Sequence, residues 1–258
     1  MKYTLVVRND DLSKKLAEDI HHGLKDELIY DNQKPDLVIS VGGDGTILEA
    51  VHQYMDVDCY YVGIHTGTLG FFTDYQRDEV DELIHDIKKN EYHCMPRHLL
   101  EVKVHLKDET KTLYALNEMR LDHGFSTQVI SVYINDVLLE VFRGNGLCVS
   151  TPSGSTAYNK SLGGALIYPG IPLMQLTEVA GIHHNAYRSL GSSLILDDRQ
   201  TIKLKGDFKD LWLGIDHLQY SFQDVESIEV HLSKRAMKFI EYKEMSFIKR
   251  VRRAYIHS

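Results

Sequence analysis

The sequence predicts two regions of different fold class: an α/β region over residues 1–95 and a mostly antiparallel, β-sandwich-like region over residues 96–236. In the first region, short apolar runs of strand length alternate with amphipathic stretches of helical period, which is typical of a parallel sheet flanked by helices. In the second region, strand-like runs are separated by polar turns. The 258 residues, of which 43% are hydrophobic, suit one large domain or two modest ones.

Three strand-helix repeats make up the first region. A strand is predicted over 5–7, and a helix beginning near Asp10 or Asp11 follows it. The apolar stripe of this helix recurs every four residues, at Leu12, Leu16, Ile20 and Leu24. The next strands, 37–41 and 60–64, precede helical apolar sets, which are Ile47, Leu48 and Val51, and then Val80, Leu83, Ile84 and Ile87. This alternation predicts a doubly wound, Rossmann-like domain with a parallel sheet.

After Pro96 the pattern is that of an antiparallel β domain. The predicted strands are 100–106, 112–121, 129–134, 137–142, 194–196 and 201–204. Asn135–Asp136 lies between two apolar runs and predicts a hairpin turn, and Asp197–Arg199 predicts another.

Charge and composition exclude some partners. The formal net charge of −8 argues against nucleic acid or an anionic membrane, because both require a concentrated basic surface. Only residues 249–253 are locally basic, and so short a cluster is typical of a solvated or internally paired chain end. The three cysteines form no C-x-x-C pair, which indicates a reducing compartment. No stretch approaches the roughly 20 apolar residues of a membrane helix, so we expect a soluble, cytoplasmic protein.

The segment Gly42–Thr46, called here the Gly–Asp turn, follows the apolar strand 37–41. Its glycines, Gly42, Gly43 and Gly45, allow a close approach to the backbone, and Thr46 can begin a helix whose free amides favour a phosphate group. Asp44 in the same turn would repel a bare phosphate. The pattern therefore indicates that Asp44 faces a hydroxyl group or a phosphate that carries a metal ion.

Residues 151–164 form a second dense block of hydroxyl groups and glycines, with one tyrosine and one lysine. Ser155 or Thr156 can cap a short helix whose amides would receive a phosphate or an adenine edge, and Tyr158 offers a ring and a hydroxyl. On composition alone, a surface turn rich in helix caps explains the block equally well.

Two pairs of residues are further candidates. Asn117–Glu118 lies inside a strand-like run, where Asn can bond an adenine edge and Glu can accept from ribose hydroxyls. An exposed strand edge is the alternative, and it would be favoured if the pair stood alone. Phe71 and Phe72 can flank a planar base, although we expect at least one of them to pack in the core.

Two common nucleotide-binding signatures are incomplete. Leu48 replaces the last glycine of G-x-G-x-x-G after Gly43, and Asn159 stands where a P-loop beginning at Gly154 needs glycine. The sequence therefore contains neither a dinucleotide fingerprint nor a Walker loop at these positions.

The motifs taken together resemble the NAD kinase family over the whole chain. They are Gly42-Gly43-Asp44-Gly45-Thr46, Gly67-x-Leu69-Gly70-Phe71, Asn117-Glu118, and Thr151-Pro152-x-Gly154-Ser155-Thr156-Ala157-Tyr158-x-x-Ser161-x-Gly163-Gly164. The Gly–Asp turn alone is shared with diacylglycerol, sphingosine and phosphofructokinase-type kinases. The block 151–164 together with Asn117–Glu118 narrows the resemblance to NAD kinases.

This resemblance implies transfer of the γ-phosphoryl group of ATP to the 2′-hydroxyl of the adenosine ribose of NAD, giving NADP. It also implies a divalent cation, usually Mg²⁺, with no side chain assigned to it, and a homo-oligomer, commonly a tetramer. A returning C-terminal segment, 237–258, would complete the first domain.

The resemblance also implies roles for individual residues. Asp44 would be the base near the 2′-hydroxyl. The residues implied for the adenosine side are Asn117, Glu118, Thr156, Ala157 and Ser161. The remaining implied NAD contacts are Gly45, Phe71, Arg143, Asn145, Tyr158, Ala180 and His217.

The chain departs from the family pattern at three places. Asn145 replaces the acid of Arg-Gly-Asp-Gly, so a hydrogen-bonding group remains there but its charge is lost. Asp216-His217-Leu218 stands where Asp-Gly-Gln is common, and Ala165 follows Gly163-Gly164 where proline is common.

Two other functions are compatible with parts of the sequence. A lipid or sugar kinase would share the Gly–Asp turn but require an apolar groove or a sugar-phosphate site, and block 151–164 argues against it. A dinucleotide sensor without chemistry would be favoured by loss of Asp44, which is present.

Overall fold

A computed structural model describes residues 1–67, 70–122, 126–243 and 246–256. The chain divides into two compact units, residues 1–97 with 237–258, and residues 98–236. Within the described residues, no helix is both long and apolar enough to cross a membrane.

The first unit contains a parallel sheet. Its strands, in spatial order, are β2 (Ile29–Tyr30), β1 (Lys2–Val7), β3 (Leu37–Gly42) and β4 (Tyr60–His65), followed on the far side of β4 by β5 (Tyr75–Gln76) and the end of β16 (Leu218–Glu241). Each of these pairs is parallel. The helices are α1 (Asp11–Leu24), α2 (Asp44–Tyr54), α3 (Val80–Lys89) and α5 (Phe247–Tyr255).

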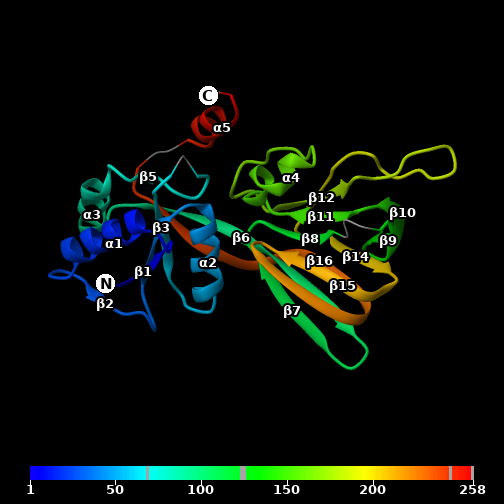
Figure 1. Cartoon of the computed structure of the whole chain (residues 1–258), viewed down its shortest axis with the longest axis horizontal. Coiled ribbons are helices and arrows are strands. Elements are labelled where there is room, and N and C mark those ends of the chain that lie inside the picture. Colours follow the sequence, from blue (N-terminus) through cyan, green and yellow to red (C-terminus); the bar gives the residue numbers. More distant parts are fainter. Residues whose placement is uncertain (68–69, 123–125, 244–245, 257–258) are drawn as a thin grey trace. The chain divides into compact units, whose positions relative to one another are not determined.

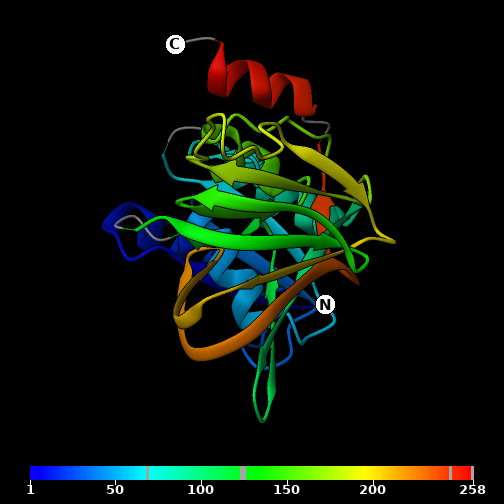
Figure 2. The same ribbon diagram turned by 90° about the vertical axis from the view of Figure 1, so that its right-hand side faces the viewer.

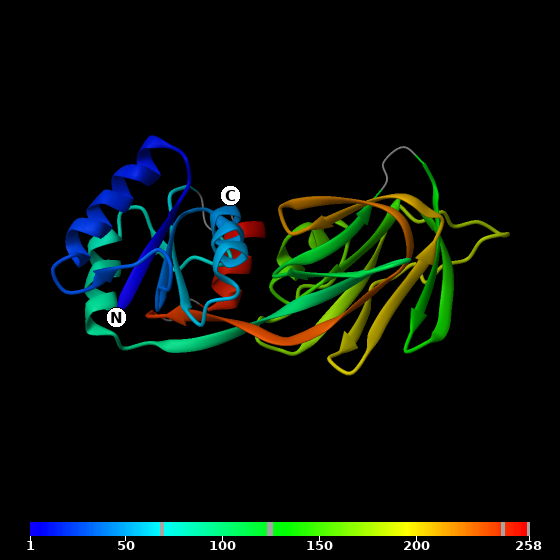
Figure 3. The ribbon, with the colours of Figure 1, turned by 90° about the horizontal axis from the view of Figure 1, so that it is seen from below.

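Helices cover both faces of this sheet. In Figure 3, α1 and α3 lie on one face and α2 lies on the other. The apolar core on the first face joins Leu16, Ile20 and Leu83 to strand residues such as Ile39 and Val62. The predicted parallel α/β class is confirmed.

Helix α1 begins where the sequence predicts, but its buried stripe differs. The Asp10 side chain caps the helix by accepting from the backbone N–H of Ser13. Leu12 is exposed, while Ser13, Leu16, Ala17 and others are buried, so including Leu12 in the apolar stripe was wrong. A spacing of four residues drifts around a helix of 3.6 residues per turn, which leaves the first leucine off the buried face.

The second unit is built from antiparallel pairs, as predicted (green to orange arrows in Figures 1 and 2). Its strands are β6 (His93–Leu106), which begins in the first unit, β7 (Thr110–Ala115), β8 (Glu118–Asp122), β9 (Gln128–Ile134), β10 (Val137–Gly144), β11 (Gly146–Ser150), β12 (Leu173–Val179), β13 (Leu194–Asp197), β14 (Thr201–Gly206), β15 (Phe208–Ile215) and most of β16. A one-turn 3₁₀ helix, η1 (Gly154–Thr156), and the short α4 (Tyr158–Ser161) follow β11.

The local predictions had different outcomes in this unit. Asn135 and Asp136 both have positive φ and join the antiparallel strands β9 and β10, so the hairpin prediction is confirmed. The second hairpin, at 197–199, was wrong, because β13 pairs with β12 whereas β14 pairs with β9 and β16. The predicted strand 112–121 is two strands, interrupted at Leu116–Asn117.

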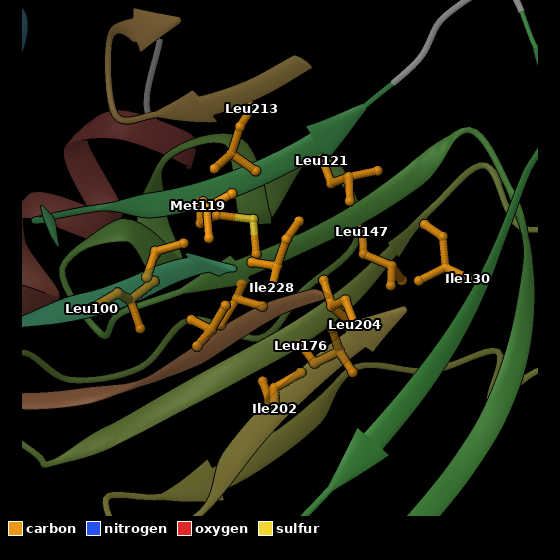
Figure 4. Packing of buried hydrophobic residues seen from close by; sticks show 14 of the residues in the cluster. Leu100, Met119, Leu121, Ile130, Leu147, Leu176, Ile202, Leu204, Leu213 and Ile228 are labelled. Carbon is orange, nitrogen blue, oxygen red and sulfur yellow. The ribbon is translucent and has the colours of Figure 1, made fainter. Parts of the chain in front are cut away.

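A large apolar cluster fills the second unit (Figure 4). Leu121, Leu147 and Leu176 from neighbouring strands meet Ile202, Leu204 and Ile228 there, all at most 2% exposed. Burying side chains of this size contributes about 1.5 to 3 kcal/mol each before chain entropy is counted. The polar residues Asn117 and Glu118 of this unit are therefore carried on a rigid framework.

Candidate functional site

The Gly–Asp turn connects β3 to α2 in the first unit. Helix α2 begins at Asp44, two residues before the predicted start at Thr46, and Gly43 is its N-cap. A Cβ on Gly42 would come within 2.1 Å of Thr46 Oγ1, so only glycine fits between the strand and the helix. A Cβ on Gly45 would meet no atom within 4 Å, so the start of the helix is open on that side.

Main-chain amides hold the Asp44 carboxylate in place. Phe71 N–H donates to Oδ2 at 2.8 Å, and Phe72 N–H donates to Oδ1 at 3.2 Å. A Cβ on Gly70 would lie 2.2 Å from Asp44 Oδ1, so this glycine allows the segment to wrap the carboxylate. Each carboxylate oxygen retains acceptor capacity for a further hydrogen bond.

The two phenylalanines have different surroundings. Phe72 is 6% exposed and packs against Phe239 with ring centroids 5.6 Å apart, so the expectation that one Phe belongs to the core is confirmed. Phe71 is half-buried, and its ring stacks on Tyr255 of α5. Leu69 of the same motif lies outside the described residues.

Helix α5 is anchored to the segment that follows Phe72. Arg250 Nη1 donates to the carbonyl oxygen of Thr73 at 2.6 Å, and its Nη2 pairs with Asp74. Arg250 and Asp74 are both buried, and burial raises the pKa of Asp74 against the opposing effect of the Arg250 charge. The basic chain end is thus partly paired within the protein.

In the second unit, Asn117 and Glu118 are both buried at the start of β8, which excludes the exposed strand edge. Within the described part of the chain, Asn117 Oδ1 and Glu118 Oε2 are buried and have no hydrogen-bond partner. Buried polar atoms are normally paired, so two unpaired acceptors on adjacent residues indicate a place for donors from a ligand.

Glu118 has an unusual protonation equilibrium. Burial, and then the charge of Asp216, raise its pKa to about 7, while Arg120 opposes the shift. Arg120 Nε lies 4.0 Å from Glu118 Oε1, too far for a strong ion pair. A carboxyl group with such a pKa is a common feature of binding and catalytic sites.

Asp216 organises the backbone around this pair, a role the sequence interpretation missed. Its carboxylate accepts from the N–H groups of Leu116, Asn117 and Glu118 at 2.8, 2.7 and 3.2 Å, and it is 4% exposed. It lies at positive φ between β15 and β16, about 100 residues away in sequence. The sequence signals were an acid between two strand-like runs and its match to the first residue of the family's Asp-Gly-Gln pattern.

Residues of block 151–164 pack against the backbone of Asn117 and hydrogen-bond to it. Gly154 packs so closely that a Cβ there would lie 2.1 Å from the Asn117 carbonyl oxygen, and Thr151 N–H donates to that oxygen at 2.8 Å. Thr151 and Ser155 are fully buried, which excludes a surface turn. The capping prediction was wrong, because Ala157 is the N-cap of α4 and makes no side-chain bond; the Ser155 hydroxyl instead donates to Pro152 O.

Tyr158 and His217 both lie near Arg120, the residue whose Nε is close to the Glu118 carboxylate. The Arg120 guanidinium lies 5.1 Å from the centre of the Tyr158 ring, and the Tyr158 hydroxyl donates to Asp122 at 3.3 Å. Arg120, Asp122 and His217 also line a cavity of about 390 Å³. Thr156 and Ala157 immediately precede Tyr158, whereas Ser161 is exposed at the end of α4.

Arg143, Asn145 and Ala180 form a separate group. Asn145 N–H donates to Val179 O at 3.0 Å, beside Ala180, and the Arg143 guanidinium lies 4.2 Å from the centre of the Tyr187 ring. In the pairing of β11 with β8, Asp122 lies opposite Gly146 and Glu118 opposite Ser150, four residues further along. At about 3.4 Å per residue, the two groups are roughly 14 Å apart along the strand.

Family models match both units. A model described as the ATP-NAD kinase N-terminal domain matches residues 7–92, and one described as the ATP-NAD kinase C-terminal domain matches residues 116–242. Curated proteins are similar over their whole length. NAD kinase 1 of Halalkalibacterium halodurans is 42% identical, with 99% of both chains covered. An NAD kinase of Staphylococcus aureus (strain Newman) is 41% identical, covering 100% of this chain and 98% of its own.

Solved structures share the fold. A yeast NADH kinase complexed with NADH has a TM-score of 0.84 at 21% identity, with 100% of this chain and 88% of that chain covered. An NAD kinase from Archaeoglobus fulgidus in complex with ATP has a TM-score of 0.76 at 22% identity, with coverages of 98% and 99%. At these identities the likeness concerns the fold.

Proposed function

The chain belongs to the NAD kinase family, and we propose that it transfers the γ-phosphoryl group of ATP to the 2′-hydroxyl of the adenosine ribose of NAD. In this reaction the 2′-oxygen forms a bond to the γ-phosphorus, and the bond from that phosphorus to the bridging oxygen of ADP breaks. The hydroxyl proton passes to a base. The products are NADP and ADP.

Asp44 is the proposed base. Its carboxylate is held by the Phe71 and Phe72 amides and still has room to accept a hydrogen bond from a ribose hydroxyl. The start of α2, which is open at Gly45, offers amides and a favourable helix dipole for phosphate oxygens. The turn therefore supplies both the proton acceptor and neutral donors for phosphate.

The observation that carries the NAD assignment is the pair of unpaired buried acceptors. The adenine amino group and the ribose hydroxyls are donors that match Asn117 Oδ1 and Glu118 Oε2. We assign Thr156, Ala157 and Ser161 to the adenosine side with them.

The remaining nucleotide contacts are also proposals. Tyr158 and His217, near Arg120, are assigned to the rest of the dinucleotide, and so is Phe71. We assign Arg143, Asn145 and Ala180 to a second contact region, and the assignment is supported by their position near the end of β11 opposite to Ser150. The proposed assembly is a homotetramer, which light scattering would report as four times the chain mass of 29.6 kDa.

We assign Mg²⁺ to the nucleotide and not to a protein cage. Within the described residues, no three His, Cys, Asp or Glu side chains are grouped to hold a metal. Mg²⁺ is commonly bound through substrate phosphates with few protein ligands, and it would neutralise phosphate charge near Asp44. EDTA should therefore stop turnover, while dialysed protein retains no stoichiometric Mg²⁺ by elemental analysis. Tightly retained metal would contradict this assignment.

The decisive assay supplies ATP, Mg²⁺ and NAD and detects NADP with an NADP-specific dehydrogenase. The expected result is NADP formed in step with ADP. A parallel reaction with NAD lacking the 2′-hydroxyl of the adenosine ribose should give neither product above background. ATP consumption without NADP would refute the proposed reaction.

A cytoplasmic location is proposed, and cell fractionation tests it.

A further inference from the structure

His65 lies beside the Gly–Asp turn and has no role in the function proposed above. It is the last residue of β4 and pairs with Gly42, the last residue of β3. In open α/β sheets, ligands bind beyond the carboxyl ends of the strands, and both residues are at that edge. A Cβ on Gly43 would lie 3.5 Å from His65 Nε2, and one on Gly70 would lie 3.0 Å from its Cδ2. The ring therefore fits between the turn and the segment that wraps Asp44.

The backbone selects one tautomer of this ring. Gly67 N–H donates to His65 Nδ1 at 2.9 Å, so Nδ1 carries no proton and the neutral ring is protonated at Nε2. Burial lowers the pKa of His65, although the Asp44 charge opposes the shift. Among the described residues, Nε2 has no hydrogen-bond partner, although His65 is only 8% exposed. An unused donor thus lies next to a turn suited to phosphate.

A neutral donor suits this position for a physical reason. Residues Gly42–Thr46 contain no lysine or arginine, and the neighbouring Arg8, whose Cβ lies close to Gly42, pairs with Asp10. The turn itself therefore has only uncharged donors for phosphate oxygens beside the negative Asp44. A cationic side chain here would pair with Asp44 and reduce its affinity for a proton. An imidazole N–H bonds a phosphate oxygen without adding a positive charge, which leaves Asp44 able to act as a base.

We infer that His65 is a phosphate-binding residue whose Nε2–H donates to an oxygen of the terminal phosphate of ATP. The inference rests on the proposed kinase reaction, because Asp44 accepts the proton from the hydroxyl that the terminal phosphoryl group must reach. That phosphate is therefore the one that meets the residues around Asp44.

Three substitutions distinguish the contribution of His65 Nε2 from that of Nδ1. In His65→Gln, the side-chain amide nitrogen can take the place of Nε2 and keep the donor. In His65→Asn, the shorter side chain can accept from Gly67 N–H but cannot reach the phosphate. His65→Phe keeps a ring and removes both polar groups.

The test measures binding of Mg²⁺ with the non-hydrolysable ATP analogue AMP-PNP, and separately with ADP, by calorimetry. For His65→Asn and His65→Phe, we expect the Kd for AMP-PNP to rise about 10- to 100-fold, the usual range for a lost hydrogen bond to a charged group. The Kd for ADP should change by less than about threefold, and His65→Gln should retain most of the parent affinity. These binding measurements do not depend on turnover. Failure of the His65 inference can therefore be told apart from failure of the proposed kinase reaction, which the NADP assay tests.

Other results would overturn the inference. Equal losses for AMP-PNP and ADP would indicate a general structural effect, and unchanged binding in His65→Asn would remove the contact. A His65→Gln protein as weak as His65→Asn would exclude Nε2 as the donor. If a variant fails to fold, ¹⁵N NMR of histidine-labelled parent protein gives the same answer. The Nε2–H signal of His65 must shift with AMP-PNP and not with ADP.

Discussion

The Gly–Asp turn and the Asn117–Glu118 pair are both partly or fully buried polar groups, but their hydrogen bonding is opposite. The Asp44 carboxylate already accepts from two main-chain amides. In the described part of the second unit, Asn117 Oδ1 and Glu118 Oε2 accept from no group at all. The backbone that carries this second pair is nevertheless fixed by Asp216 and by the turn at Gly154.

The difference follows from what each group is proposed to do. A base must be in position before the reaction, because reorganisation during the chemical step would raise the barrier. Residues that recognise a ligand gain most when the ligand supplies the missing hydrogen bonds, since unpaired buried acceptors cost free energy in its absence. In the structure, the proposed base therefore already has its hydrogen-bond donors, and the proposed recognition residues Asn117 and Glu118 each keep a buried acceptor without one.

The largest expected effect is on turnover. Asp44→Asn should bind NAD normally and lose about 10² to 10⁴ in kcat, the usual contribution of a positioned base. The amide also offers only one acceptor oxygen to the two amides of Phe71 and Phe72, so the turn should loosen. Steady-state NADP formation and NAD calorimetry measure both, with the exposed Asp19→Asn as the matched control. Near-normal turnover would remove Asp44 from its role.

Replacement of Arg250, which anchors α5, tests how firmly the Asp44 carboxylate must be held. Arg250→Met removes the cation that pairs directly with the buried Asp74 and should lower the free energy of unfolding by about 3 to 5 kcal/mol. We expect kcat to fall as well, because Thr73 and Asp74 follow the amides that hold Asp44. Urea unfolding gives the stability. The double variant Asp74→Leu/Arg250→Met should recover part of it, and equal stability of single and double variants would contradict the explanation.

For the proposed NAD-recognition residues Asn117 and Glu118, we expect a substitution to weaken ligand binding without lowering the stability of the protein. At pH 8, Glu118→Gln should weaken NAD binding by about 1 to 3 kcal/mol, since a hydrogen bond to a charged group is lost. The ligand-free variant should melt at the same temperature or higher, because a buried carboxylate has been removed. Calorimetry and thermal unfolding test this, with the exposed Glu18→Gln as control. Unchanged NAD affinity would argue against the assignment.

The smallest effect expected is a pH dependence of NAD affinity. With its pKa near 7, Glu118 of the ligand-free protein gains a proton as the pH falls, whereas ribose hydroxyl donors favour the ionised form. Affinity should rise about tenfold from pH 6 to pH 8, and the rise should vanish in Glu118→Gln. Stability of the ligand-free protein should fall from pH 4.5 to 7, because folded Glu118 holds its proton more tightly than unfolded Glu118. An opposite slope for binding would mean that protonated Glu118 is the binding form.

Local patterns predicted much of the fold and part of the site. The run 37–41 followed by glycines predicted strand, turn and helix, because burial and steric freedom act on neighbouring residues. The Asn135–Asp136 turn was predictable for the same reason. Pairing at 197–199 was not, because strands that follow each other in sequence need not be neighbours in a sheet.

The sequence by itself determined the two fold classes, the Gly–Asp turn and the motifs that identify the family, since all of these depend on short-range periodicity and spacing. The tertiary structure alone decided that main-chain amides of Phe71 and Phe72 fix Asp44, and that Asp216 fixes the backbone at Asn117. It also decided which ring nitrogen of His65 is free to donate. These contacts join residues that only folding brings together, and hydrogen bonding depends on distance and direction, which the order of residues does not specify.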